Sequence, residues 1–277
     1  MSDLTSTLSA LPGEASAFTP KPLPATHLHA KPSATYTAKL AETQALLQQA
    51  AVQFKANGQF TITQASSLGA EDVVITHLIN KLGLDIPVFV LETGALHPET
   101  LELLQQTVDS SQAPVTIYKP VTEAVVQFVA REGADAMYKS IELRKICCGI
   151  RKMEPLARAL AGKEAWITGL RREQSNARAD VPLTDESEKA STGRVKLNPL
   201  ANWTWGDVWH YIATENVTYN PLHDQFFPSI GCAPCTRAIS LGEDFRAGRW
   251  WWEAALEGGA AKECGLHVKN TAQGATA

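Results

Sequence analysis

The sequence has no run of residues apolar enough to cross a membrane, and its first residues show no basic start followed by an apolar stretch. We therefore expect neither a membrane span nor a signal peptide, and we predict a cytoplasmic protein. An excess of basic charge is also missing. The net charge is -4 and the pI is about 6.0, so no global basic field favours nucleic acid as a partner.

Cysteine is scarce but grouped. There are 5 cysteines in 277 residues, and an odd number fits a disulfide framework poorly. In a reducing compartment, grouped cysteines more often bind metal or do redox work than form structural disulfides. The rest of the composition, 44% apolar and 19% charged, is ordinary for a globular chain that can bury a large core.

Short apolar, β-branched runs alternate with segments of helical spacing through most of the chain. This alternation predicts an α/β fold with a twisted, mostly parallel sheet and helices on both faces. We expect strands at 59–65, 86–92, 114–120 and 164–170, and helices at 36–54, 71–83, 97–107, 122–133, 148–162 and 204–216, the last capped by Thr204.

Composition divides the chain into four parts. Residues 1–34 are rich in Ser, Thr, Ala and Pro and predict a disordered lead-in. Residues 35–240 predict the α/β domain that binds the ligands. Residues 241–267 predict a mobile C-terminal segment, and residues 268–277 a disordered tail.

The first candidate ligand loop is "SSLGAED", between a predicted strand and a predicted helix. Ser66 and Ser67 offer hydroxyls, Gly69 lets a backbone approach an anion, and the helix directs free N–H groups at the site. The alternative is that these residues only cap the helix. No Gly-Lys-Ser/Thr follows, so this is not a Walker A loop, and its two acids fit a nucleotide of lower charge than a triphosphate.

A second turn of the same form is "LETGALHPET". Its Thr93 follows the next predicted strand and would lie at the same sheet edge as the first loop. The hydroxyl can bond a ribose or a phosphate. An ordinary turn explains these residues equally well.

Three arginines follow the last predicted strand, in "WITGLRREQSNAR". The forked guanidinium groups of Arg171, Arg172 and Arg178 suit phosphate or sulfate. The alternative, a solvated charged face, is less favoured because no acidic partners balance all three. The segment therefore predicts an anion-binding region.

Four of the cysteines form two tight pairs, Cys147 with Cys148 and Cys232 with Cys235. Adjacent cysteines on a helix point about 100° apart and cannot easily bridge each other. Two pairs can surround a zinc ion or an iron–sulfur cluster, and four unligated buried thiols are a third alternative. Zinc sites favour two C-x-x-C pairs, so the adjacent pair favours a cluster.

The fifth cysteine, Cys264, lies near the C-terminus with Arg246, Arg249, Lys262 and His267 close in sequence. Positive neighbours lower the pKa of a thiol and make it a nucleophile. A mobile segment could carry that nucleophile over a bound nucleotide. The alternative is an incidental thiol on a tail.

Together these segments resemble the adenylyl-sulfate/phosphoadenylyl-sulfate reductase family of assimilatory sulfate reduction. They continue through "CCGIRKMEPLARAL", "VKLNPLANWTWGDVWHYI", "YNPLHDQFFPSIGCAPCTR", "GRWWWE" and "KECGLH", in family order from about residue 36 to 267. The resemblance implies an adenine nucleotide α-hydrolase-like, PP-loop-type fold. One departure is Glu92, where the family more often has Asp.

The family has two branches. One keeps only the C-terminal cysteine and uses the 3'-phosphorylated substrate. The other also carries the two cysteine pairs, and this chain is similar to it. The resemblance implies one 4Fe-4S cluster on Cys147, Cys148, Cys232 and Cys235, and adenosine 5'-phosphosulfate as the substrate.

The resemblance also implies a mechanism. Cys264 attacks the sulfate sulfur, AMP leaves, and Cys264 carries an S-sulfonate. Thioredoxin or a glutaredoxin-like reductant then releases sulfite for cysteine biosynthesis. Lys152 resembles a lysine that links the cluster and the substrate electrostatically. The implied substrate-binding residues are Ser66, Ser67, Gly69, Thr93, Lys152, Arg171, Arg172, Arg178, Arg246, Arg249 and His267.

Three rival readings remain open. One is the same chemistry on the 3'-phosphorylated substrate, and another is a PP-loop nucleotidyltransferase, which leaves Cys264 unexplained. The third is a non-enzymatic iron–sulfur or zinc protein. The tryptophan run 250–252 is read as core, with a thioredoxin-binding surface as the alternative. Relatives of this kind often form dimers or tetramers.

Overall fold

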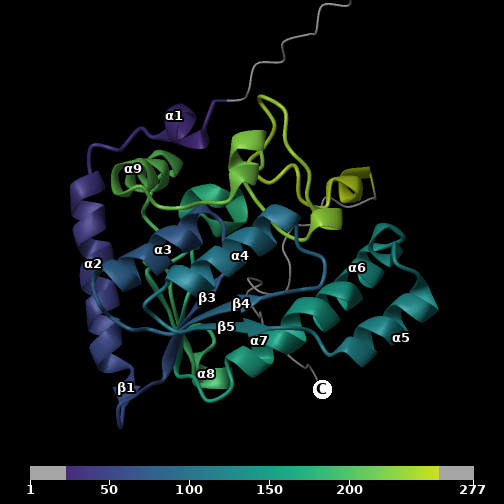
Figure 1. The fold of residues 1–277 in the computed structure, drawn as a ribbon, viewed down its shortest axis with the longest axis horizontal. Coiled ribbons are helices and arrows are strands. Elements are labelled where there is room, and N and C mark those ends of the chain that lie inside the picture. Colours follow the sequence, from purple (N-terminus) through teal and green to yellow (C-terminus); the bar gives the residue numbers. More distant parts are fainter. Residues whose placement is uncertain (1–22, 256–277) are drawn as a thin grey trace, which may run out of the picture.

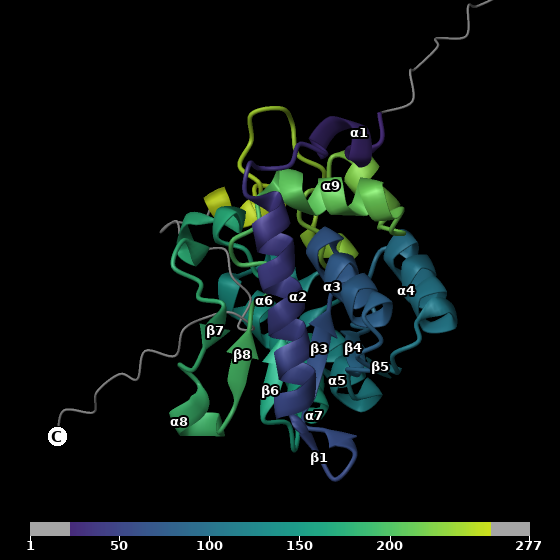
Figure 2. The same ribbon diagram turned by 90° about the vertical axis from the view of Figure 1, so that its left-hand side faces the viewer.

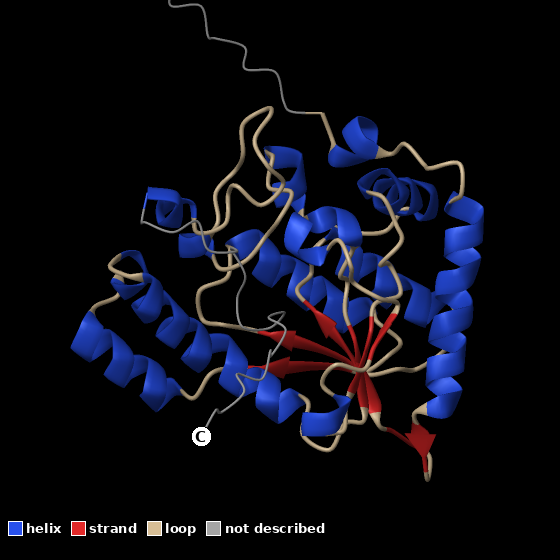
Figure 3. Cartoon of the chain, turned by 180° about the vertical axis from the view of Figure 1, so that it is seen from behind, coloured by secondary structure: helices blue, strands red, loops and turns tan. Residues whose placement is uncertain are grey.

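The centre of the molecule is a six-stranded sheet with the strand order β5-β4-β3-β6-β8-β7. In this computed structural model, which describes residues 23–255, five strands run parallel and β7 pairs antiparallel with β8 (Figures 1 and 3). A small hairpin joins β1 and β2. The strands are β1 Lys55–Ala56, β2 Gln59–Phe60, β3 Ile62–Ser66, β4 Val88–Leu91, β5 Val115–Tyr118, β6 Ala165–Ile167, β7 Thr184–Asp185 and β8 Val195–Leu197.

Helices cover both faces of the sheet, because neighbouring strand residues point to opposite sides. Val88 and Val90 join the main core with α2, α3 and α9, whereas Phe89 packs with Leu156 of α7 on the other face. The α/β prediction is confirmed. The helices are α1 Ala25–His29, α2 Tyr36–Gln53, α3 Ala70–Lys81, α4 Pro98–Ser110, α5 Thr122–Glu132, α6 Ile141–Cys148, α7 Glu154–Ala159, α8 Lys189–Thr192 and α9 Trp205–Glu215.

The strand order places a crevice between β3 and β6. From β3 the chain crosses to β4 on one side, and β6 later pairs with β3 on the other side. In open α/β sheets, ligands bind beyond the carboxyl ends of strands where the order reverses. The loops after β3, β4 and β6 therefore face one shared region.

The helix expected at 148–162 is divided. α6 begins earlier, at Ile141, because the Ser140 hydroxyl accepts a hydrogen bond from the Leu143 N–H at 3.1 Å. A π-helical turn, Gly149–Met153, follows the adjacent cysteines and leads into α7. Pro155 has no N–H, so the regular hydrogen-bond ladder cannot continue through it.

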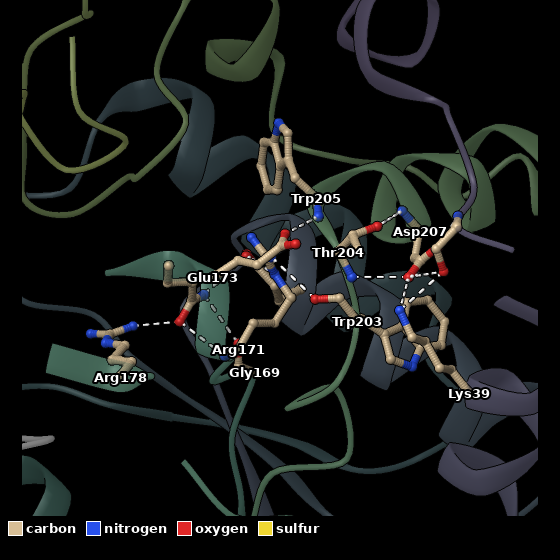
Figure 4. Close-up of polar contacts among 12 residues, drawn as sticks. Lys39, Gly169, Arg171, Glu173, Arg178, Trp203, Thr204, Trp205 and Asp207 are labelled. Atoms are coloured by element: carbon tan, nitrogen blue, oxygen red, sulfur yellow. Dashed lines mark hydrogen bonds and ion pairs between the residues drawn. The ribbon is translucent and has the colours of Figure 1, made fainter. Parts of the chain in front are cut away.

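The predicted N-cap of α9 is confirmed. The Thr204 hydroxyl accepts from the Asp207 N–H at 3.0 Å, and the Asp207 carboxylate accepts from the Thr204 N–H at 2.9 Å (Figure 4). Lys39 of α2 also reaches Asp207, at 2.8 Å. Burial works to raise the pKa of Asp207, but these partners lower it to about 2. The pair fixes α2 against α9.

The ordered body extends beyond the predicted boundaries at both ends. α1 lies beside α9 (Figure 2), Ala25 is fully buried, and the Ala25 N–H donates to Asp224 at 2.7 Å. Disorder over 1–34 is therefore wrong for α1. Within 241–267, Trp250 is 1% exposed, so that part packs on the body. Residues 1–22 and 256–277 lie outside the described residues. No helix in the described range is long and apolar enough to cross a membrane.

Candidate active site

A cavity of about 200 Å³ opens at the carboxyl ends of β3, β4 and β6. We call it the sheet-edge pocket. Ser66 ends β3, the loop after it supplies Ser67 and Gly69, the loop after β4 supplies Thr93, and Gly169 follows β6. The structure thus brings the two predicted ligand loops together at the crevice that the strand order creates.

One wall of the sheet-edge pocket is apolar. Phe89, Leu91, Leu156 and Trp166 line it together with Ala65. Apolar and aromatic walls with a few polar groups are typical of small-molecule sites. This wall suits a planar, weakly polar group such as a purine base.

The lining of the pocket also includes four cationic side chains, Lys152, Arg178, Arg246 and Arg249. Arg246 and Arg249 each donate from Nη1 to the Ser229 hydroxyl at 3.3 Å, so two guanidinium groups converge on one point. Cations arranged in this way suit phosphate or sulfate.

Gly231 makes room for Arg249. A Cβ at Gly231 would lie 2.3 Å from Nη2 of Arg249. The absence of a side chain therefore lets the guanidinium lie across the loop, where it also donates to the Ile230 carbonyl at 3.2 Å. Arg249 was predicted as a site residue, but Gly231, which leaves space for its guanidinium, was not.

The loop after β3 is held by its own side chains. The Asp72 carboxylate accepts from the N–H and the hydroxyl of Ser67 at 2.7 and 2.6 Å. The Ser66 hydroxyl accepts from the N–H of Leu68, which has a positive φ of 62°. Burial raises the pKa of Asp72 to about 6. Both hydroxyls therefore shape the loop as well as line the pocket.

Arg171 does not line the pocket, which corrects the prediction that it faces phosphate or sulfate. It is 1% exposed, and its Nε donates to Glu71 at 2.9 Å. Its guanidinium also lies over the rings of Trp205 and Phe245, at 5.3 and 5.8 Å. Burial works to raise the pKa of Glu71, but Arg171 and Gln174 lower it. Arg171 thus stabilises the pocket wall.

The prediction that Arg172 faces the anion is also wrong, whereas Arg178 does line the pocket. Arg172 is exposed and donates to the Val181 carbonyl at 2.9 Å, away from the pocket. Arg178 is buried, lines the pocket, and donates to the Gln174 amide oxygen at 2.5 Å. Of the three predicted arginines, the structure brings one to the pocket.

Besides Gly231, two residues that line the pocket were not predicted from the sequence. Gln174 bonds both Glu71 and Arg178, at 2.9 and 2.5 Å, and its position three residues after Arg171 was the available clue. His223 lines the pocket and is 6% exposed. Burial lowers the pKa of His223 to about 4, so its ring is neutral at pH 7. Only its place in "YNPLHDQ" could have pointed to it.

A second cavity, of about 280 Å³, lies next to the first, and we call it the cysteine cavity. The structure brings the two cysteine pairs together there, although one pair lies at the end of α6 and the other in the turn at residues 232–235. Its lining includes Cys147, Cys148, Cys232, Cys235, Arg144, Arg151, Lys152, Arg249 and Trp250.

Three of the four cysteines have a polar neighbour. Arg151 lies near enough to Cys147, and Arg144 to Cys148, to interact electrostatically with their sulfurs. Thr93 Oγ1 lies 3.2 Å from the sulfur of Cys232, so its hydroxyl is directed at the cysteine cavity and not only at the nucleotide side. Such contacts orient metal ligands and tune the bound group.

Glu92, the departure from the family pattern, supports its own turn. Its carboxylate accepts from the Gly94 N–H at 2.6 Å and also pairs with Lys119 at 3.6 Å. Arg151 donates to the Thr93 carbonyl at 2.7 Å across the same turn. The longer acid therefore supports the loop that carries Thr93.

The lining of the cysteine cavity has the chemistry of a site for an anionic group held by thiolates. It combines four cysteine sulfurs with four cationic side chains. Among residues 23–255, no group of three or more His, Cys, Asp or Glu side chains is placed to hold a metal ion. A cluster held by four thiolates is bulky and anionic. Burial raises the pKa of Cys235 to about 12, so loading such a group must release its proton.

The two cavities touch through shared residues. Lys152 and Arg249 line both, and Lys152 lies in the π-helical turn directly after the adjacent cysteines. A group in one cavity and an anion in the other would share these cations. Cys264 and His267 lie outside the described residues.

The sheet order, the crevice pocket and the loop after β3 define a PP-loop-type nucleotide-binding fold. Phosphoadenylyl-sulfate reductase from Candida auris superposes with a TM-score of 0.58 at 28% identity, over 72% of this chain and 92% of that one. FMN adenylyltransferase from Candida glabrata gives 0.52 at 13% identity, over 82% and 78%, and shares the fold. The predicted fold family is confirmed.

Sequence comparison narrows this class. The phosphoadenosine phosphosulfate reductase domain matches residues 61–238, and the chain belongs to this family. Adenosine 5'-phosphosulfate reductase from Allochromatium vinosum is 50% identical over 212 residues, 76% of this chain and 80% of that protein. The Burkholderia cepacia protein of the same name is 51% identical over 204 residues, 74% and 79%. The predicted resemblance is confirmed.

Proposed function

We propose that this chain reduces adenosine 5'-phosphosulfate to sulfite and AMP in assimilatory sulfate reduction. The names of its relatives support this substrate. The observation that carries the proposal is the contact between the two cavities, in which Lys152 and Arg249 line both the sheet-edge pocket and the cysteine cavity.

The sheet-edge pocket divides as this substrate does. The base would lie against the apolar wall of Phe89 and Trp166, and the phosphosulfate would face Arg178, Arg246 and Arg249. The paired acids Glu71 and Asp72 in the first turn of α3 fit a nucleotide of lower charge better than one with an added phosphate. Adenosine 5'-phosphosulfate is therefore favoured over its 3'-phosphorylated form.

The first chemical step would be carried by Cys264. Its thiolate attacks the sulfate sulfur, an S–S bond forms, and the bond between that sulfur and the bridging oxygen breaks. AMP leaves with the bonding electron pair, and Cys264 carries an S-sulfonate. The cations around Ser229 would stabilise the negative charge that develops on the leaving phosphate.

The second step needs two electrons from a dithiol. One thiolate of thioredoxin or a glutaredoxin-like protein attacks the Cys264 sulfur and expels sulfite with the bonding pair. The second thiol then resolves the mixed disulfide, which restores the Cys264 thiol and leaves the reductant oxidised. This requirement fits the reducing cytoplasm, where we place the protein.

One 4Fe-4S cluster would be held by Cys147, Cys148, Cys232 and Cys235. When bound, it supplies a rigid anionic link between α6 and the 232–235 turn. Around it, Thr93, Arg151 and Arg144 orient the sulfurs that they contact. Lys152 would balance charge between this site and the substrate.

The test is an anaerobic assay of the full chain with thioredoxin and its reducing system. The two sulfated nucleotides, without and with the 3'-phosphate, are assayed separately for sulfite, and iron and acid-labile sulfide are measured on the same sample. We expect sulfite mainly from the unphosphorylated nucleotide and about four irons per chain. Sulfite mainly from the phosphorylated form would reverse the specificity.

The nucleophile is tested separately. Cys264→Ser should abolish sulfite formation while iron content and AMP binding stay unchanged, because Cys264 is not among the four cavity cysteines. Sulfite at the rate of the unmodified protein would reject the mechanism. Zinc in place of iron, with no sulfite from either nucleotide, would leave only a structural metal site.

A further inference from the structure

A buried ion pair joins α6 to the last described residues. Arg144 donates from Nε and Nη2 to both carboxylate oxygens of Glu253, at 2.7 and 3.1 Å. The two residues are 3% and 8% exposed. The turn at residues 251–255, yellow in Figure 1, is drawn near α6 in that view. A buried charge pair of this geometry strongly resists the loss of either partner.

Arg144 also belongs to the cysteine cavity. Its guanidinium lines the cavity with Cys148, near enough to interact electrostatically with that sulfur, and lies 4.6 Å from the centre of the Trp250 ring. A guanidinium presents five donors in a fixed fork, so it can serve a carboxylate and a sulfur at once. Arg144 is therefore in contact with a cavity cysteine and with the C-terminal segment.

The C-terminal segment in turn forms a wall of that cavity. Trp250 is 1% exposed and packs with Cys232 and Cys235. The backbone N–H of Trp250 donates to the Cys235 carbonyl at 3.2 Å. Its φ of 44° is unusual for a bulky residue, and such a conformation persists only when its surroundings hold it. Arg249 lies 4.8 Å from the same ring.

We propose that Glu253 is a positioning residue that couples loading of the four cysteines to docking of residues 249–253. Through Arg144 it anchors the segment beside Cys148. An anionic group on the cysteines attracts Arg144 and Arg249 and fills the space against Trp250. Docking of the segment in turn encloses that group. By linkage, each event stabilises the other by the same factor.

This coupling rests on the proposed function and adds to it. Glu253 precedes the proposed nucleophile, Cys264, in the sequence, so the coupling concerns the described part of the chain that leads to it.

The experiment compares the full chain, purified anaerobically, with a portion stripped of its metal by a chelator. Amide hydrogen exchange is measured for residues 249–253, together with the rate of iron release to the chelator. In the unmodified protein we expect stripping to speed exchange about tenfold. Glu253→Gln should exchange rapidly in both states and release iron about tenfold faster.

The control is Glu243→Gln. Glu243 pairs with Arg237 at 2.7 Å in the same C-terminal region, but it is half-buried and lines neither cavity. It should behave as the unmodified protein does. Glu253→Asp keeps the charge and should restore part of the dependence on metal, which also serves if Glu253→Gln does not fold.

The result that overturns the proposal is a loading-dependent difference in exchange that Glu253→Gln leaves intact. A purely structural role would speed exchange by the same factor in the loaded and stripped states. Neither exchange nor iron release depends on sulfite formation. A chain that shows the coupling but makes no sulfite would reject the proposed function alone, and a chain that holds no metal at the cysteines would reject the coupling.

Discussion

The two adjoining cavities are built in different ways. The sheet-edge pocket takes its ligand loops from the carboxyl ends of parallel strands, whereas the cysteine cavity takes its sulfurs from α6 and from a turn near the C-terminal third. The first is a property of the sheet. The second exists only when distant parts of the chain pack together.

Their electrostatics differ as well. Glu71 and Asp72 lie among the residues of the sheet-edge pocket, and Arg171 balances the first of them. The described lining of the cysteine cavity has several cations, with Asp135 as its one carboxylate. The pocket is thus of mixed charge and suits a nucleotide, while the cavity suits an anionic group.

The largest expected effect separates the two cavities. Cys232→Ser removes one of four metal ligands, so we expect iron to fall to near zero and sulfite formation to be lost, as typical for removal of a ligand from a four-thiolate site. AMP affinity should change by less than about threefold, below 0.7 kcal/mol. Iron analysis and calorimetric titration with AMP test this.

The control for that prediction is Cys264→Ser, which should keep its iron. If Cys232→Ser retained iron, the assignment of the four cysteines as ligands would be wrong. If AMP affinity fell with the iron, the pocket and the cavity would not be separable.

The next effect is on the pocket wall. Arg171→Met leaves Glu71 buried without its ion-pair partner, and we expect a loss of about 3 kcal/mol in the free energy of unfolding. Urea denaturation monitored by fluorescence measures it. Arg172→Met, one residue along on an exposed side chain, should change stability by less than about 0.5 kcal/mol. Equal effects would reject the structural role of Arg171.

A third prediction concerns pH and the sheet-edge pocket. In the unfolded chain His223 binds its proton near pH 6.5, but in the folded chain only near pH 4. The contribution of His223 to the free energy of unfolding is therefore full above pH 6.5 and is lost as the pH falls toward 4. Between pH 8 and pH 5 the unmodified protein should lose about 2 kcal/mol more stability than His223→Gln.

Denaturation at the two pH values tests the histidine. The exposed His27 provides the control, because His27→Gln should follow the unmodified protein. A His223→Gln variant with the same pH dependence as the unmodified protein would show that burial of His223 does not hold its ring neutral.

The smallest expected effect lies where the cavities meet. Gly231→Ala would displace the Arg249 guanidinium, because the new Cβ would lie 2.3 Å from Nη2. We expect AMP affinity to fall about tenfold, or about 1.4 kcal/mol. Gly149→Ala is the control, since a Cβ there meets no atom within 4 Å. Unchanged affinity in Gly231→Ala would mean that Arg249 does not hold the nucleotide.

The strands from β3 to β6 and the helices α2, α3, α4, α5 and α9 were predicted because their apolar spacing is local, whereas β7, β8, α1 and α8 were not predicted. The Thr204 cap was predicted because its partner is three residues away. The loops with Ser66 and Thr93 follow from that pattern, since parallel strands end at one edge. The start of α6 was missed because its cap, Ser140, is one serine without a distinctive pattern.

The sequence by itself determined the α/β class, the two ligand loops, and the grouping of cysteines that predicts a metal centre. Only the tertiary structure decided which arginines reach the pocket: Arg178 lines it, whereas Arg171 is held by Glu71 and does not. The same holds for Arg144 and Glu253, which meet across the chain. Local spacing specifies backbone conformation, whereas the partner of a long charged side chain depends on which distant elements pack beside it.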